Sequence, residues 1–415
     1  MRICKKHGME INFIMETKVT KLELETRIEK LCTAMTKRNP QWDTALIISR
    51  VNQYYFTGTM QDGLLVIKRN GTAQFFVRRS FPRAMEESPL VESQLCTIYP
   101  MESYRDAAPI VGSDLGETLV ETETLTMGII ERIKKYFNMN NLFSIENIIS
   151  EVRAVKSQYE LYWMQEAGRL HKILLDEVVP SILREGMSEL ELTAEMYSKM
   201  LKMGYHGVTR FYRYQTEMIA GQIGFGENSL VDTNFDGPGG MRGMCPAVPI
   251  IGSRDRFLKK GDLVFIDIGF GMYGYHSDRT QVYMFGDTPS EEVIEAHRKC
   301  IEIEKRTAQL LRPGNIPSEI YKSIMEDLDS DFLFNFMGFE DRRAKFLGHG
   351  IGLHVDENPV IANGFNSPLQ ENMVLALEPK KGIAGVGVVG VEDTYIVTPN
   401  GGKCITGGEK DIIIV

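Results

Sequence analysis

The sequence is poor in several features that mark common protein classes. Its six cysteines are scattered without a CxxC pair, which argues against a paired-cysteine motif and favours free thiols in a reducing cytoplasm. No apolar run approaches the roughly 18 residues of a membrane-spanning helix. A net charge of −9 without a long basic run argues against a general binder of nucleic acid or anionic membranes.

The rest of the composition is that of a large globular protein. Of the 415 residues, 43% are hydrophobic and 25% are charged, and this length predicts two domains, with three as the alternative. Residues 1–18 are basic but lack the apolar core of a signal peptide, so they are interpreted as an N-terminal extension, with Met15 as an alternative start. We expect one domain over residues 19–155 and a second over 156–415.

Local patterns predict helices and strands in both domains. Apolar residues at helical spacing follow Val19, whereas "TALIIS" and "GLLVI" are typical of buried strands and "YYFTGT" of an aromatic β-type run. A long helix is expected from Gln158 until Pro180 kinks or ends it, and Ser188 forms a capping box for the next helix. Another helix is predicted to begin at the N-cap Thr288 and to run to about residue 311. Glycine-rich turns between further strands indicate an α+β domain.

Two aspartates lie on one predicted hairpin, in "GDLVFIDIGFGMYGYHSDRTQVY". If the chain turns at Met272 and Tyr273, Asp267 and Asp278 face each other across the strands. Facing carboxylates repel, so a protein must protonate one, expose both to water or supply a cation. A divalent metal is the most specific of these alternatives, and a solvent-exposed hairpin end is the simplest one.

A second pair of acids repeats this arrangement. Glu378 ends the apolar run that begins at Met373, and Glu392 lies inside a second apolar run. His349 adds an imidazole in "GHGIG", where glycines allow the backbone to bend around a ligand. A lone histidine is usually structural, but one imidazole with four carboxylates suits Mn, Co, Fe or Zn and not a thiolate-bound metal.

These motifs, in this order, resemble the "pita-bread" metallopeptidases of family M24, which include prolidase, X-Pro aminopeptidase and the related creatinase. The resemblance covers residues 19–415 and includes "YYFTGT", the Asp–Asp pair, "GHGIG", "LEP" and "VED". It implies an α+β chain with a creatinase-type N-terminal α/β domain. A catalytic domain with a curved antiparallel sheet would follow.

The resemblance also implies a site with two divalent ions, manganese being favoured over cobalt, zinc or iron. Asp267 would chelate one ion, Asp278 and Glu392 would bridge both, and His349 and Glu378 would hold the other. A hydroxide bound by both ions would be the nucleophile, with Glu378 as general base. Thr280 would hold a bridging carboxylate in its orientation without itself binding an ion.

The sequence departs from the family around the substrate. Relatives carry histidines where this chain has Ile250, Lys345 and Asp356, and an arginine is common where it has Gly390. As a hypothesis, His354 takes over the imidazole role while Asp356 orients it or binds a substrate amine, because residues two apart on a strand share a face. The alternative is that both side chains face solvent.

The function expected from the resemblance is hydrolysis of the Xaa-Pro bond of dipeptides or short peptides by a cytoplasmic homodimer. Two alternatives stay open because the accessory histidines are replaced. One is another C–N hydrolase with a small non-peptide substrate, and the other is a non-catalytic binding module.

Overall fold

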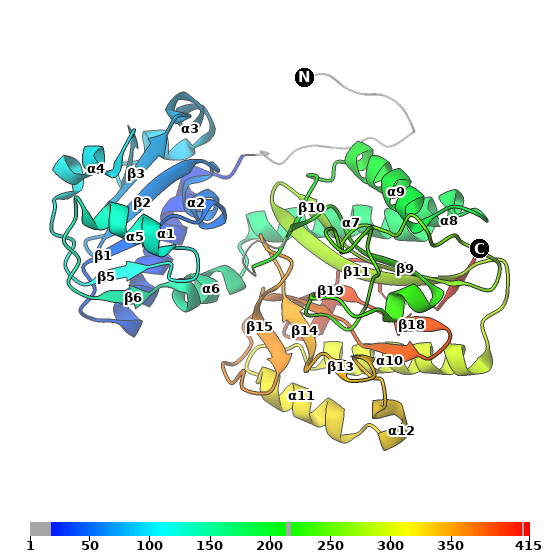
Figure 1. Ribbon diagram of the computed structural model, residues 1–415. Helices are drawn as coiled ribbons and strands as arrows, with labels where there is room; N and C mark the ends of the chain where they lie inside the picture. The colour runs from blue at the N-terminus through cyan, green and yellow to red at the C-terminus, as the bar shows by residue number, and fades with distance from the viewer. Residues whose placement is uncertain (1–17, 213–216, 409–410) are drawn as a thin grey trace. The chain divides into compact units, whose positions relative to one another are not determined.

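The computed structural model describes residues 18–212, 217–408 and 411–415, so nearly all of the extension predicted for residues 1–18 lies outside it (Figure 1). The chain divides into two units, Met1–Val152 and Arg153–Val415, each with its own sheets and helices. Among the described residues, no helix is long and apolar enough to cross a membrane.

The first unit is built on a six-stranded mixed sheet in the order β4-β3-β2-β1-β5-β6. Strand β2 is antiparallel to both of its neighbours, β1 and β3, whereas β4, β5 and β6 each join a neighbour in parallel. The strands are β1 (Thr44–Ile47), β2 (Asp62–Lys68), β3 (Ala73–Arg78), β4 (Cys96–Pro100), β5 (Thr118–Val120) and β6 (Leu142–Ser144). The helices are α1 (Lys21–Arg38), α2 (Arg50–Thr57), α3 (Phe81–Glu87), η1 (Pro89–Glu92), α4 (Tyr104–Val111), α5 (Met127–Lys134) and α6 (Glu146–Ala154).

The helical pattern after Val19 is confirmed, but "YYFTGT" is not a β-type run. Helix α1 buries the apolar stripe Leu24, Ile28, Leu31 and Met35. Tyr54 to Thr57 form the last turn of α2, which ends at Gly58 with φ 73°, a left-handed conformation that favours glycine at a helix end. A short aromatic run has no clear period, so its packing against the sheet decides its conformation.

The second unit contains two larger sheets and three two-stranded pairs. The larger sheets have the orders β21-β11-β10-β9 and β15-β14-β16-β19-β20, and the pairs are β7-β8, β12-β13 and β17-β18. The strands are β7 (Thr209–Arg210), β8 (Glu217–Met218), β9 (Gly221–Phe225), β10 (Leu263–Met272), β11 (Tyr275–Met284), β12 (Gly338–Phe339), β13 (Arg342–Arg343), β14 (Phe346–Gly350), β15 (Glu357–Ala362), β16 (Val374–Leu377), β17 (Lys380–Ile383), β18 (Gly387–Gly390), β19 (Asp393–Thr398), β20 (Gly401–Cys404) and β21 (Ile413–Ile414).

Helices cover the outer faces of these sheets, with α7 against β10 and β11 and α10 against β17, β18 and β20 (Figure 1). The helical segments are α7 (Gln158–Ile173), η2 (Leu174–Val178), α8 (Val179–Ile182), α9 (Glu189–Met203), η3 (Gly226–Leu230), α10 (Glu291–Gln309), α11 (Pro317–Glu326) and α12 (Ser330–Leu333). The α+β class expected from the sequence is confirmed.

The helix boundaries of this unit follow their caps. Helix α7 begins at Gln158 as predicted, the π-helical turn η2 follows it, and Pro180 lies in the first turn of α8, which ends at Ile182. The capping box at Ser188 is present. The predicted N-cap Thr288 is wrong, because Ser290 accepts the Val293 amide and α10 begins after it.

The predicted register of the aspartate hairpin is also wrong, by two residues. The turn lies at Tyr273 and Gly274, whose φ values of 49° and 92° are those of a tight two-residue hairpin turn. Asp267 therefore faces Thr280, and Asp278 faces Gly269. A shift of two residues keeps each side chain on its face, so the two aspartates remain diagonal neighbours.

Candidate metal centre

The five residues predicted to bind metal come together in the second unit. Their positions are Asp267 on β10, Asp278 on β11, His349 on β14, Glu378 directly after β16 and Glu392 directly before β19. All five line one cavity of about 640 Å³. Strands from both larger sheets supply them, and an isolated bridge between Thr280 and Glu392 joins those sheets beside the site.

Their donor atoms form two overlapping groups. Asp278, His349 and Glu392 offer one nitrogen and two carboxylate oxygens within 4.8 Å of one another. Asp267, Glu378 and Glu392 offer three carboxylate oxygens within the same limit. The first group has the mixed donors that suit a borderline divalent ion, and the second has the oxygen donors of a harder one.

His349 presents its Nε2 atom to the carboxylates. Its Nδ1 lies 3.1 Å from the Gly350 carbonyl oxygen, which accepts only, so the proton is assigned to Nδ1. Nε2 lies 3.3 Å from Glu378 Oε1 and 3.8 Å from Glu392 Oε1. A neutral imidazole in this tautomer directs a lone pair into the acidic cluster, which is the arrangement that a metal ligand requires.

The pKa values reflect the electrostatic strain of this cluster. Burial, reinforced by Asp267, raises the pKa of Asp278 to about 8. Burial and then Asp278 also raise the pKa of Glu392 well above its usual value. Burial alone would lower the pKa of His349, but Glu378 and Asp278 raise it to about 9. Like charges at such close range call for a cation.

One cation that the sequence interpretation missed is supplied by the chain itself. Lys380 Nζ lies 3.0 Å from Asp267 Oδ2, 2.9 Å from Glu378 Oε2 and 2.6 Å from Glu392 Oε2. Burial alone would lower the pKa of Lys380, but these three carboxylates raise it well above its usual value. The signal was present in "LEPKK", because Lys380 follows Glu378 by two residues in extended chain and so shares its side.

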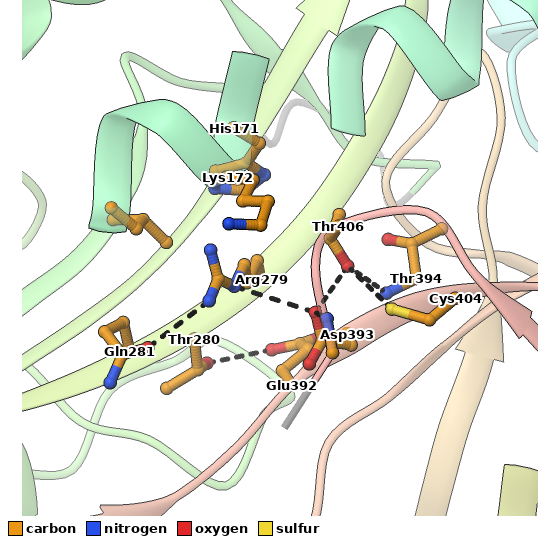
Figure 2. A network of polar contacts seen from close by, with 12 residues as sticks. His171, Lys172, Arg279, Thr280, Gln281, Glu392, Asp393, Thr394, Cys404 and Thr406 are labelled. Atoms are coloured by element: carbon orange, nitrogen blue, oxygen red, sulfur yellow. Dashed lines mark hydrogen bonds and ion pairs between the residues drawn. The ribbon is translucent and has the colours of Figure 1, made fainter. Parts of the chain in front are cut away.

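A polar network behind the site orients Glu392 (Figure 2). Thr280 Oγ1 donates to Glu392 Oε2 at 3.1 Å, as the resemblance implied for this threonine. The next residue, Asp393, points the other way and meets Arg279 Nε at 3.6 Å and the Thr406 hydroxyl at 2.6 Å. Arg279 is buried and also donates to Asp176 at 2.9 Å. These contacts separate the two neighbouring acids, leaving Glu392 as the one that faces the cavity.

His354 and Asp356 do not share a face as the hypothesis required. Residues 351–356 form a series of bends and not a strand, so the alternation argument fails there. Asp356 lines the cavity, and burial raises the pKa of its carboxyl to about 6. His354 is buried outside the described cavity lining, with Nδ1 3.1 Å from Arg153. The geometry therefore supports contact with substrate for Asp356 only.

The other substituted positions lie at different distances from the cavity. Lys345 lines it, whereas Ile250 is not among the described residues that do so. Gln222, missed in the sequence, also lines it, and neither polar atom of its buried amide has a described partner. The cavity walls are largely apolar side chains: Phe211, Met218, Phe235, Phe346, Val355 and Phe365.

The fold and the donor set define an α+β protein with a candidate divalent-metal centre, and comparison with known families agrees. The model of metallopeptidase family M24 matches residues 163–399, and that of the creatinase/prolidase N-terminal domain matches residues 27–155. The first match spans more than half of the 415 residues. The chain therefore belongs to metallopeptidase family M24, and the pita-bread fold expected from the resemblance is confirmed.

Similar proteins and structures extend along nearly the whole chain. A Xaa-Pro dipeptidase of Pyrococcus furiosus is 26% identical over 94% of this chain and 100% of its own length. The crystal structure of a prolidase from Pyrococcus horikoshii matches with a TM-score of 0.74 at 24% identity, covering 94% of this chain and 100% of that one. An X-Pro aminopeptidase structure from Thermotoga maritima matches with a TM-score of 0.72 at 22% identity, covering 94% and 99%.

Proposed function

We propose that this protein is a metal-dependent hydrolase that cleaves the Xaa-Pro bond of dipeptides or short peptides. The observation that carries the proposal is the convergence of Asp267, Asp278, His349, Glu378 and Glu392 on one cavity of about 640 Å³. The relatives named Xaa-Pro dipeptidase and prolidase support this substrate class. The cavity volume suits a small ligand or a short peptide.

Asp278, His349 and Glu392 fit a divalent ion, because their donors lie within 4.8 Å of one another and His349 presents its Nε2 atom to the carboxylates. When bound, such an ion lowers the pKa of a coordinated water and polarises a carbonyl. The second donor group does not fit an ion in the same way, because the Lys380 ammonium lies among its oxygens. Manganese, with cobalt, zinc or iron as alternatives, stays a prediction.

Glu378 is the proposed general base. Its carboxylate lies at the cavity wall between His349 and Lys380, at 3.3 and 2.9 Å. Burial raises the pKa of Glu378, but Lys380 and His349 lower it below its usual value, so the group is ionised near neutral pH. An ionised carboxylate there would take the proton of the attacking water and return it to the leaving proline nitrogen.

The rest of the cavity provides binding surfaces for a small peptide. The apolar walls would hold the proline ring and the preceding side chain, and Asp356 would pair with the amino terminus. The domain assignment of residues 19–155 and 156–415, the homodimer and a cytoplasmic location remain predictions of the same proposal. None of the described cysteines is in a disulfide.

The test is an assay of the purified chain reconstituted with manganese or cobalt. Xaa-Pro dipeptides, longer Xaa-Pro peptides and matched Xaa-Ala peptides are compared, and we expect hydrolysis of the proline substrates that disappears with a chelator. Glu378→Gln should reduce kcat by at least about 100-fold. Hydrolysis of Xaa-Ala alone, or of no peptide at all, would contradict the proposal.

A further inference from the structure

Lys380 occupies the middle of one of the two donor groups. Its ammonium carries three N–H donors, and three carboxylate oxygens, from Asp267, Glu378 and Glu392, lie 3.0, 2.9 and 2.6 Å away. The side chain is 0% exposed, so water does not compete for these contacts. Each donor has a charged acceptor, which accounts for the full hydrogen-bonding capacity of the ammonium.

The two glutamates divide their oxygens between Lys380 and His349. Oε2 of Glu378 and of Glu392 faces Lys380, whereas Oε1 of each lies nearest His349, at 3.3 and 3.8 Å. The cluster therefore has two sides that share the same pair of carboxylates. One side contains the ammonium, and the other contains the imidazole and Asp278.

An ion and an ammonium cannot occupy the same side together. A divalent ion of this class binds carboxylate oxygens at about 2.0–2.2 Å, so an ion among Asp267, Glu378 and Glu392 would stand where the lysine nitrogen now lies. On the His349 side, one nitrogen and two carboxylates remain for one ion, and three protein ligands suffice for a catalytic metal with an open position.

We propose that the Lys380 ammonium takes the place of one of the two ions predicted from the sequence. The chain then binds one divalent ion, held by Asp278, His349 and Glu392. This inference rests on the proposed function for the presence of a metal, and it changes the number of bound ions from two to one. The lysine supplies the fixed positive charge that orients Asp267 and Glu378. Unlike a metal ion, it has no coordination position that a water molecule or a substrate could occupy.

The neighbouring strand is shaped to admit the lysine. Across the β17-β18 hairpin Lys380 pairs with Gly390, the position where relatives commonly carry an arginine. A Cβ atom at Gly390 would lie 2.4 Å from the Pro379 carbonyl oxygen and 2.6 Å from Lys380 Cα, so the facing backbone excludes a side chain there. It would also lie 3.1 Å from Lys380 Cγ and so crowd the lysine stem. The Lys380 carbonyl accepts from the Met337 amide at 2.8 Å, which holds the strand in place. Glycine at position 390 therefore leaves the inward lysine stem its space.

The first experiment counts ions in the wild-type protein. The full chain is stripped with chelator, reconstituted with excess Mn²⁺, desalted and measured by elemental mass spectrometry, and an anomalous difference map at the manganese edge locates the ion. We expect one equivalent per chain, at the His349 side. Zero or two equivalents, or one ion among Asp267, Glu378 and Glu392, would overturn the inference.

The second experiment removes the ammonium. Lys380→Ala should raise the count from one to two Mn²⁺ per chain, whereas the matched control Lys381→Ala should keep one. Lys381 is the next residue, but its ammonium donates outward to the Phe332 carbonyl at 2.8 Å. A folded Lys380→Ala protein that still binds one ion would contradict the replacement, and if that variant does not fold, the wild-type count and map decide.

These outcomes are separable from failure of the proposed function. One ion at the His349 side without hydrolysis of any Xaa-Pro peptide would sustain the Lys380 inference and contradict the substrate. Two ions together with Xaa-Pro hydrolysis would overturn the Lys380 inference and support the proposed substrate.

Discussion

Replacing Glu357 by glutamine tests how much a buried ion pair next to the metal centre contributes to the stability of the fold. The Glu357 carboxylate meets Arg153 and lies 3.5 Å from Lys156, and all three side chains are at most 6% exposed. It also accepts the His354 backbone amide at 2.9 Å, which anchors the bends between His349 and β15. Glutamine keeps the size and one acceptor oxygen but leaves two buried cations without this counter-charge.

The magnitude follows from the shifted pKa of Glu357. Burial alone would raise this pKa, but Arg153 and Lys156 lower it from 4.5 to about 2. Because the folded value lies below the unfolded one, ionised Glu357 stabilises the fold above pH 4.5 and loses that effect as the pH falls toward 2. The difference corresponds to about 3 kcal/mol at pH 7 and roughly half of that near pH 3. Breaking a buried ion pair costs about 3–5 kcal/mol, which agrees.

The assay is urea unfolding at pH 7 and near pH 3, followed by tryptophan fluorescence. The chain has two tryptophans, Trp42 in the first unit and Trp163 in the second, so a Trp42→Phe background reports on the second unit. Glu357→Gln should lower the free energy of unfolding by about 3 kcal/mol at pH 7 and by clearly less near pH 3. The control Glu326→Gln, whose exposed partner Lys322 lies 3.7 Å away, should change it by less than about 0.5 kcal/mol.

Two results would refute this reasoning. One is a loss below about 1 kcal/mol at pH 7, which would mean that the buried charges do not depend on Glu357. The other is an equal loss at both pH values, which would assign the effect to packing.

Two further predictions concern the cavity. Thr280→Val removes the hydroxyl that donates to Glu392 at 3.1 Å, so Mn²⁺ affinity measured by calorimetry should fall about 10-fold or more, and unchanged affinity would contradict an orienting role. Asp356→Asn should raise KM for Xaa-Pro dipeptides about 10-fold at pH 8 with kcat nearly unchanged. Because the pKa of Asp356 is about 6, the variant and wild-type KM values should converge at pH 5, and a pH-independent difference would exclude pairing with the substrate amine.

Much of the architecture was predictable because local patterns determine it. The stripe from Leu24 to Met35 defines α1, and the capping box of Ser188 defines the start of α9, since both signals act within a few residues. The boundary at Ser290 and the helical "YYFTGT" segment were missed, because Thr288 and Ser290, two residues apart, can each cap a helix and a short aromatic run fits helix or strand. In such cases tertiary packing selects the outcome.

The candidate site divides in the same way. The sequence by itself placed Asp267 and Asp278 on the same side, because strand alternation keeps them on one face even when the register moves by two residues. Only the tertiary structure decided that His354 turns toward Arg153, since the bends after Gly350 follow no period. It also decided that Lys380 enters the acidic cluster, because a long flexible side chain takes the position that surrounding charges and the space beside Gly390 allow.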